Sequence, residues 1–358
     1  MVDGEFTKEI FDSIAMTCYE QMTRNKQSVS YPKAFVLGGQ PGAGKTGLQK
    51  IMTELCNNNL IVINADEFRE FHPDFQRLQC KYGKNSVDYT GKFSGQMTET
   101  LISMLKSKNY NVLVEGTLRT AQVPLETCDR FKDKGYEVTL AVMAVKPEIS
   151  YISTILRYEA MCAEGKTPRA TSKEAHENVV NRLPDNLKKI YDSRKFDNIV
   201  IYNRSGECLY DLSKNPNARP EEIITEIFYG KWNQNELNQF FEIGKCTYEF
   251  MLKRNAEEIG NFKTDVFNQK ILQSIAQKNN LIISEEMQKF FCMQNLFDAK
   301  VINPYYIENI NQEQAALVSK SGIPAGYNSK VGIIVVNKED ADKVKALLGC
   351  EKRDNIKR

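Results

Sequence analysis

The sequence predicts an α/β protein built around a parallel β-sheet that helices cover on both faces. Short continuous apolar runs recur between residues 34 and 202, and segments with helical spacing of apolar residues separate them. Parallel strands have uninterrupted apolar runs because both faces of their sheet are buried. A glycine-rich turn directly follows the first run. Together these observations indicate alternating strands and helices around a ligand site at the sheet edge.

The expected elements follow in order along the first part of the chain. Apolar residues at helical spacing predict a helix over residues 5–26, and the run 34–37 predicts the first strand. Further strands are expected at 60–63, 112–114, 137–145 and 199–202, with helices at 45–56, 93–107, 148–164 and 220–229. Ligands bind such sheets beyond the carboxyl ends of the strands, where the glycine turn, Asp66 and Glu115 are expected.

A domain boundary is expected near residue 230. The helix 220–229 ends at Gly230, and Asn, Gln and Lys become more frequent beyond it. We expect one domain over residues 1–230 and a mostly helical accessory domain of unassigned role over residues 231–358. Its predicted elements are helices at 234–256, 264–279, 284–297 and 338–348 and a strand at 331–336.

The overall composition argues against several classes of function. The 358 residues carry a formal net charge of +2, which gives no general attraction to nucleic acid or to an anionic membrane. The nine cysteines are scattered without a CxxC pair, so neither a zinc site nor a disulfide framework is expected. No apolar run approaches the ~18 residues of a membrane span, and the start lacks signal-peptide features. We therefore expect a cytoplasmic protein with no nucleic-acid or membrane partner.

The segment after the first strand matches a phosphate-binding loop. The pattern G-x-x-x-x-G-K-[ST] occurs as Gly39-Gln40-Pro41-Gly42-Ala43-Gly44-Lys45-Thr46. Its glycines let backbone N–H groups turn toward phosphate oxygens, and the following helix adds its positive end. Lys45 would contact the β- and γ-phosphates of ATP, and Thr46 would bind Mg²⁺. This setting predicts a P-loop kinase-like fold, although the loop alone predicts nucleotide binding and not phosphoryl transfer.

Two acidic residues at strand ends are candidates for work on an acceptor. A kinase usually provides a carboxylate that takes the proton of the acceptor hydroxyl, and Asp66 is the best candidate. Asp66 also precedes a plausible helix start, so it could be an N-cap instead or as well. Glu115, with Arg119 four residues later, could bind the acceptor or support a metal. The alternative is an ion pair between them that holds a loop.

Two arginines could form a lid over the phosphates. Arg157 lies in the helix 148–164, and Arg169 follows the loop 165–168. Guanidinium groups there would neutralise charge that develops on the transferred group, whereas ordinary surface arginines are the alternative. Lys45, Asp66, Arg157 and Arg169 are therefore the candidate catalytic residues.

Three other titratable side chains carry weaker signals. Neither His72 nor His176 has the neighbours that a metal site or a histidine relay needs, so both are expected to be structural or peripheral. Glu99, on the helix 93–107, would by itself be taken for a solvated charge.

From about residue 30 to 215 the chain resembles the zeta toxin family. These proteins are phosphotransferases of bacterial toxin–antitoxin systems and are similar to UDP-N-acetylglucosamine kinases. Besides the phosphate-binding loop, the resemblance rests on Asn64-Ala65-Asp66-Glu67-Phe68 with His72-Pro73, Met97-Thr98-Glu99, Val114-Glu115-Gly116-Thr117-Leu118-Arg119-Thr120, Ala141-Val142-Met143-Ala144-Val145, Ile155-Leu156-Arg157-Tyr158-Glu159, Arg169-Ala170-Thr171 and Asn181-Arg182-Leu183-Pro184.

The resemblance implies a role for each matching residue. Lys45 and Thr46 would serve ATP and Mg²⁺, while Arg157 and Arg169 would bind the ATP phosphates. Asp66 would be the general base on the 3′-hydroxyl of the amino sugar. An antitoxin protein would block the nucleotide site. The sugar-nucleotide pocket would be lined by Asp66, Glu99, Glu115, Arg119 and Thr127.

Two residues depart from the family pattern. Asn64 stands where an acidic residue can occur, and Leu118, where a small residue is common, could reshape the acceptor pocket. We expect ATP-dependent phosphorylation of UDP-N-acetylglucosamine by a toxin. The alternatives are another small-molecule P-loop kinase and a nucleotide-binding regulatory protein or attenuated toxin without transfer activity. The resemblance does not extend to residues 231–358, which could be an antitoxin-like module or a helical accessory domain.

Overall fold

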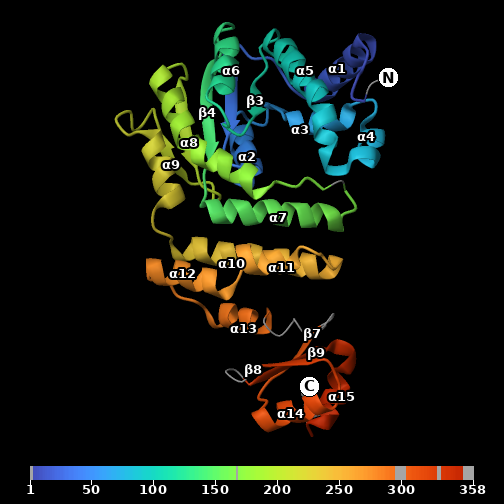
Figure 1. The fold of residues 1–358 in the computed structure, drawn as a ribbon. Helices are drawn as coiled ribbons and strands as arrows, with labels where there is room; N and C mark the ends of the chain where they lie inside the picture. Colours follow the sequence, from blue (N-terminus) through green and yellow to red (C-terminus); the bar gives the residue numbers. More distant parts are fainter. Residues whose placement is uncertain (1–2, 167, 295–303, 329–331, 350–358) are drawn as a thin grey trace, which may run out of the picture. The chain divides into compact units, whose positions relative to one another are not determined.

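The computed structural model describes residues 3–166, 168–294, 304–328 and 332–349 (Figure 1). The chain divides into two compact units, Met1–Lys231 and Trp232–Arg358. Each unit has a hydrophobic core of its own. Among the helices in these ranges, none combines the length and apolar character that crossing a membrane would require.

The first unit is built on a six-stranded sheet with the order β2-β3-β1-β4-β5-β6. Its strands are β1 (Lys33–Gly38), β2 (Ile61–Ile63), β3 (Val112–Glu115), β4 (Glu137–Met143), β5 (Asn198–Tyr202) and β6 (Cys208–Asp211). β1 to β5 are parallel, which confirms the predicted fold class, and β6 is antiparallel to β5. β6 was not predicted, because this four-residue edge strand lacks a continuous apolar run.

The parallel register places the carboxyl ends of β1, β2 and β3 side by side along one edge of the sheet. Leu37 of β1 is paired with Glu115 of β3, and Ile63 of β2 is paired with Val114. The glycine turn after β1 and the segment after β2 therefore leave the sheet beside Glu115. This edge is where the candidate site residues meet.

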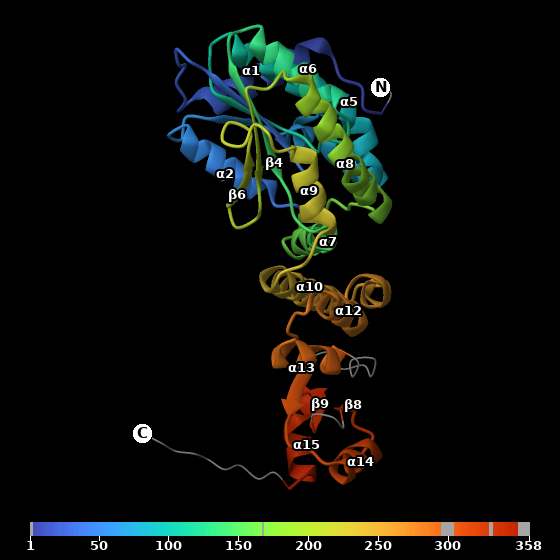
Figure 2. The same cartoon turned by 90° about the vertical axis from the view of Figure 1, so that its left-hand side faces the viewer.

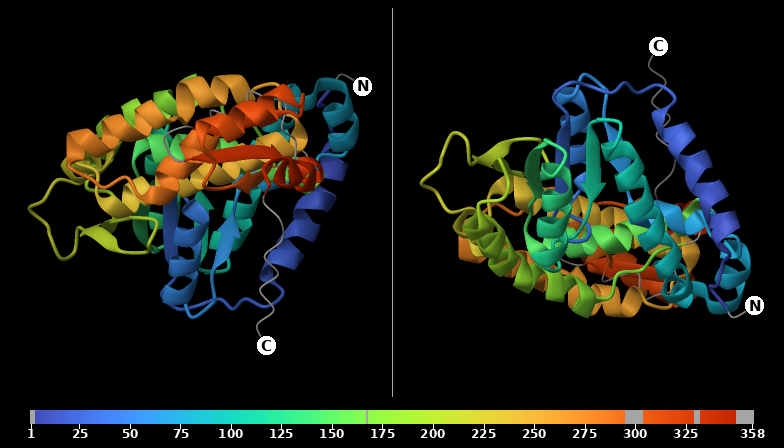
Figure 3. Two further views of the ribbon diagram at one scale, coloured as in Figure 1. Left: turned by 90° about the horizontal axis from the view of Figure 1, so that it is seen from below. Right: turned by 90° about the horizontal axis from the view of Figure 1, so that it is seen from above.

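Helices cover both faces of this sheet, as Figure 2 shows for α2 (Lys45–Leu55) on one side and α8 (Lys173–Ser193) on the other. Alternate residues of β1 serve the two faces, since Phe35 and Leu37 pack with α2 and Ala34 and Val36 with the larger core. That larger core also uses α1 (Lys8–Thr23), α5 (Ser86–Lys106), α6 (Gln122–Lys132) and α9 (Pro220–Tyr229), with α1 lying along α5 (Figure 3).

Several helices were absent from the sequence-based prediction or shorter in it. α5 begins at Ser86, seven residues before the expected start, and α4 (Phe75–Tyr82), α6 and α8 were not predicted. α8 contains Pro184 in its interior, a residue that normally ends a helical pattern. α4 has only eight residues and is mostly polar, so it offers few apolar residues from which a helix can be predicted.

The N-terminal segment is fastened to the connection that leads from β2 to α5. This connection contains α3 (Ala65–Phe68), a 3₁₀ turn Arg69–Phe71, α4 and a second 3₁₀ turn Gly83–Asn85. The Asp3 carboxylate accepts hydrogen bonds from Arg77 Nη1 at 2.6 Å, Lys81 Nζ at 2.6 Å and the Tyr82 hydroxyl at 2.5 Å. These donors hold the pKa of Asp3 well below its usual range.

The second unit begins with helices around an aromatic core. α10 (Gln234–Arg254), α11 (Ile259–Asn261), a π-helical turn Phe262–Val266, α12 (Gln269–Asn279) and α13 (Glu285–Gln294) follow in order. The helix predicted over 264–279 is interrupted, because the Asn268 side chain accepts a hydrogen bond from Ile271 N and caps a new helix. Residues 295–297 of the predicted helix 284–297 lie outside the described residues.

The second unit ends in a three-stranded antiparallel sheet with the order β7-β9-β8 (Figure 1). Its elements are β7 (Pro304–Ile307), α14 (Gln312–Lys320), β8 (Ala325–Asn328), β9 (Ile333–Asn337), a 3₁₀ turn Lys338–Asp340 and α15 (Ala341–Leu347). Ile334 and Val336 of β9 pack with residues of α14 and α15. The sequence predicted β9 and the helical segment after it but neither of the edge strands, which are four residues long.

Both histidines of the first unit pack in its interior. His176 of α8 faces α7 (Pro147–Ala163), where its Nε2 lies 2.8 Å from Ser150 Oγ. His72 Nδ1 accepts a hydrogen bond from the Asp74 N–H, and its ring contacts Phe6 and Phe93 edge-on. Burial lowers the pKa of His176 to about 4. Both imidazoles therefore pack against neighbouring elements of the fold, as expected for histidines with a structural role.

The buried His176 should make the first unit less stable as the pH falls from about 6.5 to about 4. Within that window the unfolded chain carries a proton on this imidazole and the folded chain does not, so protons favour unfolding. The difference between the two pKa values corresponds to a loss of roughly 3 kcal/mol in the free energy of unfolding once the pH is below both values. Urea unfolding at pH 7 and pH 4.5 should therefore show a smaller loss of free energy in His176→Asn than in the wild type. Equal pH dependence in the two proteins would contradict this assignment.

Candidate active site

The phosphate-binding loop connects β1 to α2 and requires glycine where other elements approach it. Gly39 has a φ of 134° and Gly42 a φ of 76°. A Cβ atom on Gly39 would lie 2.4 Å from Met143 O, and one on Gly42 would lie 2.0 Å from Ser150 O. Gly44, at the N-cap of α2, supplies no side-chain cap. No capping side chain therefore competes with an anion at the start of α2, although the Gly47 N–H already donates to Gly44 O at 2.9 Å.

Arg204, in the turn after β5, binds this loop through the loop's backbone carbonyl groups. Its Nε donates to Ala43 O at 3.0 Å, and its Nη2 donates to Gly42 O and to Ser153 Oγ. Burial lowers the pKa of Arg204 to about 10, so the guanidinium keeps its charge at neutral pH. Sequence reasoning missed Arg204, whose one available signal is a basic residue beyond the end of a predicted strand.

Gln40 is a loop residue whose side chain is buried. Its Nε2 donates to Val145 O at 2.7 Å. The amide therefore ties the loop to the end of β4, and the loop is fixed from two sides by Gln40 and Arg204.

Lys45 and Glu115 form the central ion pair of the site. Lys45 Nζ lies 3.8 Å from Glu115 Oε1, and Glu115 Oε2 accepts a hydrogen bond from Gln49 Nε2 at 2.6 Å. Burial lowers the pKa of Lys45, an effect that Glu115 opposes. Burial raises the pKa of Glu115, an effect that Lys45 opposes. The ion pair considered between Glu115 and Arg119 is not formed, because Glu115 faces Lys45.

Asp66 lies inside α3 with its carboxylate 59% exposed. The N-cap alternative for Asp66 is wrong, because Asn64 is the N-cap and accepts a hydrogen bond from the Asp66 N–H at 3.1 Å. Two arginines face the carboxylate. Arg69 Nε lies 3.1 Å from Oδ1, and Arg169 Nη1 lies 3.9 Å from Oδ2.

Arg157 of α7 and Arg169 add positive charge to the same edge. Burial lowers the pKa of Arg157, and the neighbouring Arg169 lowers it further, whereas Asp66 and Glu115 oppose both effects. Arg157 Nη2 also donates to Thr171 Oγ1 at 3.4 Å. The structure thus brings the predicted Lys45, Asp66, Glu115, Arg157 and Arg169 into one group of interacting charges. The predicted lid loop 165–168 includes residue 167, which lies outside the described residues.

A hollow of about 330 Å³ lies beside this charged group. Glu115, Leu118, Arg119 and Thr127 line it together with the ends of β1 and β3. Asn186 of α8 fixes its wall by donating to the backbone oxygens of Leu118 and Arg119, both at 2.9 Å.

Leu118 lines this hollow and has an unusual backbone conformation. Its φ is 54°, a left-handed conformation that leucine seldom adopts. Its side chain lies over Gly38, where an added Cβ would come within 2.3 Å of Leu118 Cδ1. Thr127 Oγ1 donates to Val123 O within α6 at 2.9 Å, so this hydroxyl is already engaged in its helix.

Glu99 is separate from the other predicted acceptor residues. It forms an ion pair with Arg130 of α6 and lines a different hollow, of about 790 Å³, together with residues of α1. The pair joins α5 to α6. Of the predicted acceptor side chains, Glu115, Arg119 and Thr127 share one hollow, whereas neither Glu99 nor Asp66 lines it.

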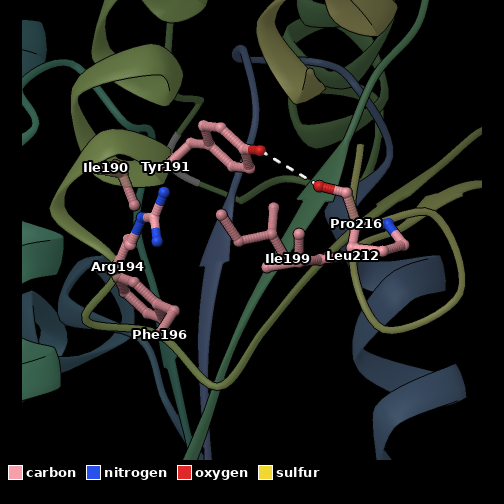
Figure 4. Close-up of a pocket in the computed structure, with 7 residues that line it drawn as sticks. All are labelled: Ile190, Tyr191, Arg194, Phe196, Ile199, Leu212 and Pro216. Atoms are coloured by element: carbon pink, nitrogen blue, oxygen red, sulfur yellow. Dashed lines mark hydrogen bonds between the residues drawn. The ribbon is translucent and has the colours of Figure 1, made fainter. Parts of the chain in front are cut away.

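Another hollow, of about 300 Å³, lies near the amino end of strand β5 (Figure 4). Arg194 at the end of α8 and Ile199 at the start of β5 line it, and the Tyr191 hydroxyl donates to Pro216 O across it. Because it adjoins the amino end of β5, it is remote from the phosphate-binding loop. None of the predicted site residues lines it.

The oxygen donors near the loop suit a magnesium ion that arrives with a nucleotide. Mg²⁺ in such sites takes few protein ligands and is held largely by phosphate oxygens and water. Thr46 is exposed at the start of α2, and Glu115 supplies a nearby carboxylate. Within the described ranges no cluster of three or more His, Cys, Asp and Glu side chains could hold a metal ion by itself.

Comparison with known proteins gives consistent matches. Residues 17–215 match the family model described as zeta toxin. Toxin PezT of Streptococcus pneumoniae is 40% identical over 251 residues, which is 70% of this chain and 98% of that protein. Toxin zeta of Streptococcus agalactiae is 39% identical over 239 residues, which is 66% of this chain and 83% of that protein.

A solved structure agrees with these sequence matches. It comes from the structural characterization of the PezAT chromosomal toxin–antitoxin system of Streptococcus pneumoniae and is 39% identical, with a TM-score of 0.65. The alignment covers 70% of this chain and 99% of that one. On the extent of the family match and this identity, the chain belongs to the zeta toxin family.

Proposed function

We propose that the chain is the toxin of a toxin–antitoxin system and transfers the γ-phosphoryl group of ATP to UDP-N-acetylglucosamine. The acceptor atom is the 3′-hydroxyl oxygen of the amino sugar. The observation that carries the proposal is that Asp66, a carboxylate, and three cationic side chains meet at the phosphate-binding edge. Family membership supports the choice of acceptor. Residues 1–230 make up the kinase domain, and residues 231–358 are an accessory domain.

The nucleotide side of the site consists of residues 39–46, Arg157 and Arg169. The loop N–H groups and the start of α2 bind phosphate oxygens, and Lys45 contacts the β- and γ-phosphates. Desolvation and mutual repulsion of Lys45 and Arg157 leave a positive field that a triphosphate compensates. Thr46 holds Mg²⁺, which when bound neutralises part of the phosphate charge.

The acceptor side lies between Asp66 and the hollow at Glu115, Arg119 and Thr127. Asp66 takes the proton of the 3′-hydroxyl while the hydroxyl oxygen forms a bond to the γ-phosphorus. The bond from that phosphorus to the β–γ bridging oxygen breaks, and ADP leaves. Arg157 and Arg169 stabilise the charge on the transferred group. The exposed Arg119 provides a cation for the diphosphate of the acceptor.

An antitoxin protein is the proposed partner. A solved relative comes from a toxin–antitoxin system, and a toxin made in the cell that it harms needs a neutralising partner. An antitoxin that covers the loop at residues 39–46 would prevent ATP from binding. The proposal therefore places its binding surface over the nucleotide side of the site.

A second candidate is a kinase that acts on another small-molecule acceptor. Leu118 favours it, because this side chain lines the hollow at a position where the family resemblance leads us to expect a smaller residue. A screen of sugar nucleotides, nucleotides and antibiotics with ATP would separate the two candidates. If UDP-N-acetylglucosamine is a poor substrate beside another compound, the second candidate is correct.

The purified protein should form a phosphorylated sugar nucleotide from ATP and UDP-N-acetylglucosamine. Mass spectrometry would detect the gain of one phosphoryl group, and NMR would place it on the 3′-oxygen. UDP-glucose, which lacks the acetamido group, is the control acceptor. An absence of product above background in a protein that still binds ATP would refute the proposed reaction.

Replacing Asp66 by Asn should lower kcat by about 10²- to 10⁴-fold, the usual scale for loss of a general base. ATP affinity, measured by calorimetry, should change little, because the loop and Lys45 remain. Asp74→Asn is a matched control, since Asp74 lies in the same connection and also pairs with an arginine three residues later. Full activity of Asp66→Asn would show that another group accepts the proton.

Expression of the chain alone should arrest growth, and Lys45→Ala should abolish the arrest. The reason is that Lys45 acts on the nucleotide that drives the transfer. A protein that binds nucleotides without transfer, the remaining alternative, predicts normal growth with the wild-type chain. Growth curves with matched expression levels, checked by immunoblot, distinguish the two outcomes.

A further inference from the structure

The geometry points to Arg69 as the residue that positions Asp66 for proton transfer. This inference rests on the proposed function, in which Asp66 is the general base. Arg69 touches neither the loop nor the hollow described above, and it acts through Asp66. Its contacts were not foreseen from the sequence, because they depend on how the connection after β2 folds back on α5.

Asp66 needs such support because little else in its surroundings fixes the carboxylate. α3 has four residues and follows β2, a three-residue strand at the edge of the sheet. A carboxylate that is 59% exposed has several rotamers open to it, and ordering it costs conformational entropy. A general base must nevertheless lie within hydrogen-bond reach of the proton it takes.

Arg69 connects Asp66 to α5, a helix that packs into the hydrophobic core. Its Nη1 donates to Val87 O at 2.8 Å and to Thr90 Oγ1 at 3.2 Å, both in α5. Its Nε donates to Asp66 Oδ1 at 3.1 Å. α5 is 21 residues long and buries Phe93 and Met97 in the core. The planar guanidinium, held at one end by α5, thus sets the position of the carboxylate at its other end.

The arrangement also separates the roles of the two carboxylate oxygens. Oδ1 is occupied by Arg69, whereas Oδ2 is turned toward Arg169, which lies 3.9 Å away. Arg169 belongs to the proposed phosphate-binding side. Oδ2 is therefore the oxygen that is presented to an acceptor hydroxyl between Asp66 and the γ-phosphate.

A second ion pair in the same connection shows what makes Arg69 different. Arg77 pairs with Asp74 at the same spacing of three residues, at 2.7 Å, and its side chain is 47% exposed. Its other hydrogen-bond partner is Asp3, in the N-terminal segment. Arg69 is 22% exposed and is anchored on α5. Exposed pairs at this spacing contribute little to stability, so a large effect of Arg69 on turnover would reflect positioning.

Arg69→Ala should lower kcat by about 10- to 100-fold, the scale expected when a reacting group is misplaced, and leave the KM for ATP within about twofold. Thr90→Val, which removes one anchor and keeps the side-chain shape, should lower kcat in the same direction by a smaller factor. Guanidinium ion at millimolar concentration should restore part of the activity of Arg69→Ala. Arg77→Ala is the matched control and should keep wild-type kcat.

The double variant Asp66→Asn/Arg69→Ala identifies the route of the effect. If Arg69 acts through Asp66, its removal should cost almost nothing when Asp66 is already replaced. A full additional loss in the double variant would overturn the inference. Unchanged kcat in both Arg69→Ala and Thr90→Val would also overturn it, as would an equal loss in Arg77→Ala.

The single variants separate this inference from the proposed function. If Asp66→Asn is fully active, the proposed role of Asp66 fails, and the inference fails with it. If Asp66→Asn is impaired while Arg69→Ala and Thr90→Val are not, the proposed function stands and the positioning role alone fails. Should Arg69→Ala fail to fold, Thr90→Val and its double variant with Asp66→Asn provide the same test.

Discussion

The parallel pairing of β1 with β3 is the constraint on which the site depends. Because Leu37 is paired with Glu115, the glycine turn after β1 leaves the sheet next to a carboxylate at the end of β3. α2 must then start beside that carboxylate, which places Lys45 3.8 Å from Glu115. β2 pairs on the far side of β3, so the segment with Asp66 emerges at the same edge. A shift of one residue in this register would turn Glu115 to the other face of the sheet.

Charge burial at this edge is costly in the absence of a ligand and favours binding of a polyanion. Desolvation lowers the pKa of Lys45 and Arg157, and Arg169 adds repulsion on Arg157. Glu115 and Asp66 compensate for part of this positive charge, but neither carboxylate is dedicated to a single cation. Buried charges are tolerated when they are paired and hydrogen-bonded. A nucleotide triphosphate would complete the pairing, because it supplies the remaining negative charge where the cations meet.

Local patterns were predicted well from the sequence, and contacts between distant residues were not. The phosphate-binding loop, the five parallel strands and the strand-end location of Asp66 and Glu115 follow from short stretches of chain. By contrast, Arg204 reaches Ala43 across 161 residues, and no local pattern encodes that contact. Glu115 was considered as a partner of Arg119, yet the start of α2 brings Lys45 closer. Glu99 shares no hollow with Thr127, because the side of α5 that carries it faces α1 and Arg130. α8 was not predicted, because Pro184 in its interior is a residue that normally ends a helix. Burial of Leu183 and Leu187 offsets the cost of this proline to the helix.

Two arginines that are remote from each other in sequence hold the two sides of the proposed reaction, the nucleotide side and the acceptor side. Arg204 donates to the carbonyl groups of Gly42 and Ala43, so the proposed phosphate-binding loop is held in place before a nucleotide arrives. Arg69 joins the Asp66 carboxylate to α5, so the acceptor side is held by an element of the hydrophobic core. Groups that are fixed in advance need little reorganisation when charge develops during transfer. The proposed in-line transfer would need a fixed geometry from a site made of a loop and a four-residue helix. Arg204 joins the loop to α7 through Ser153, and Arg69 joins the helix to α5.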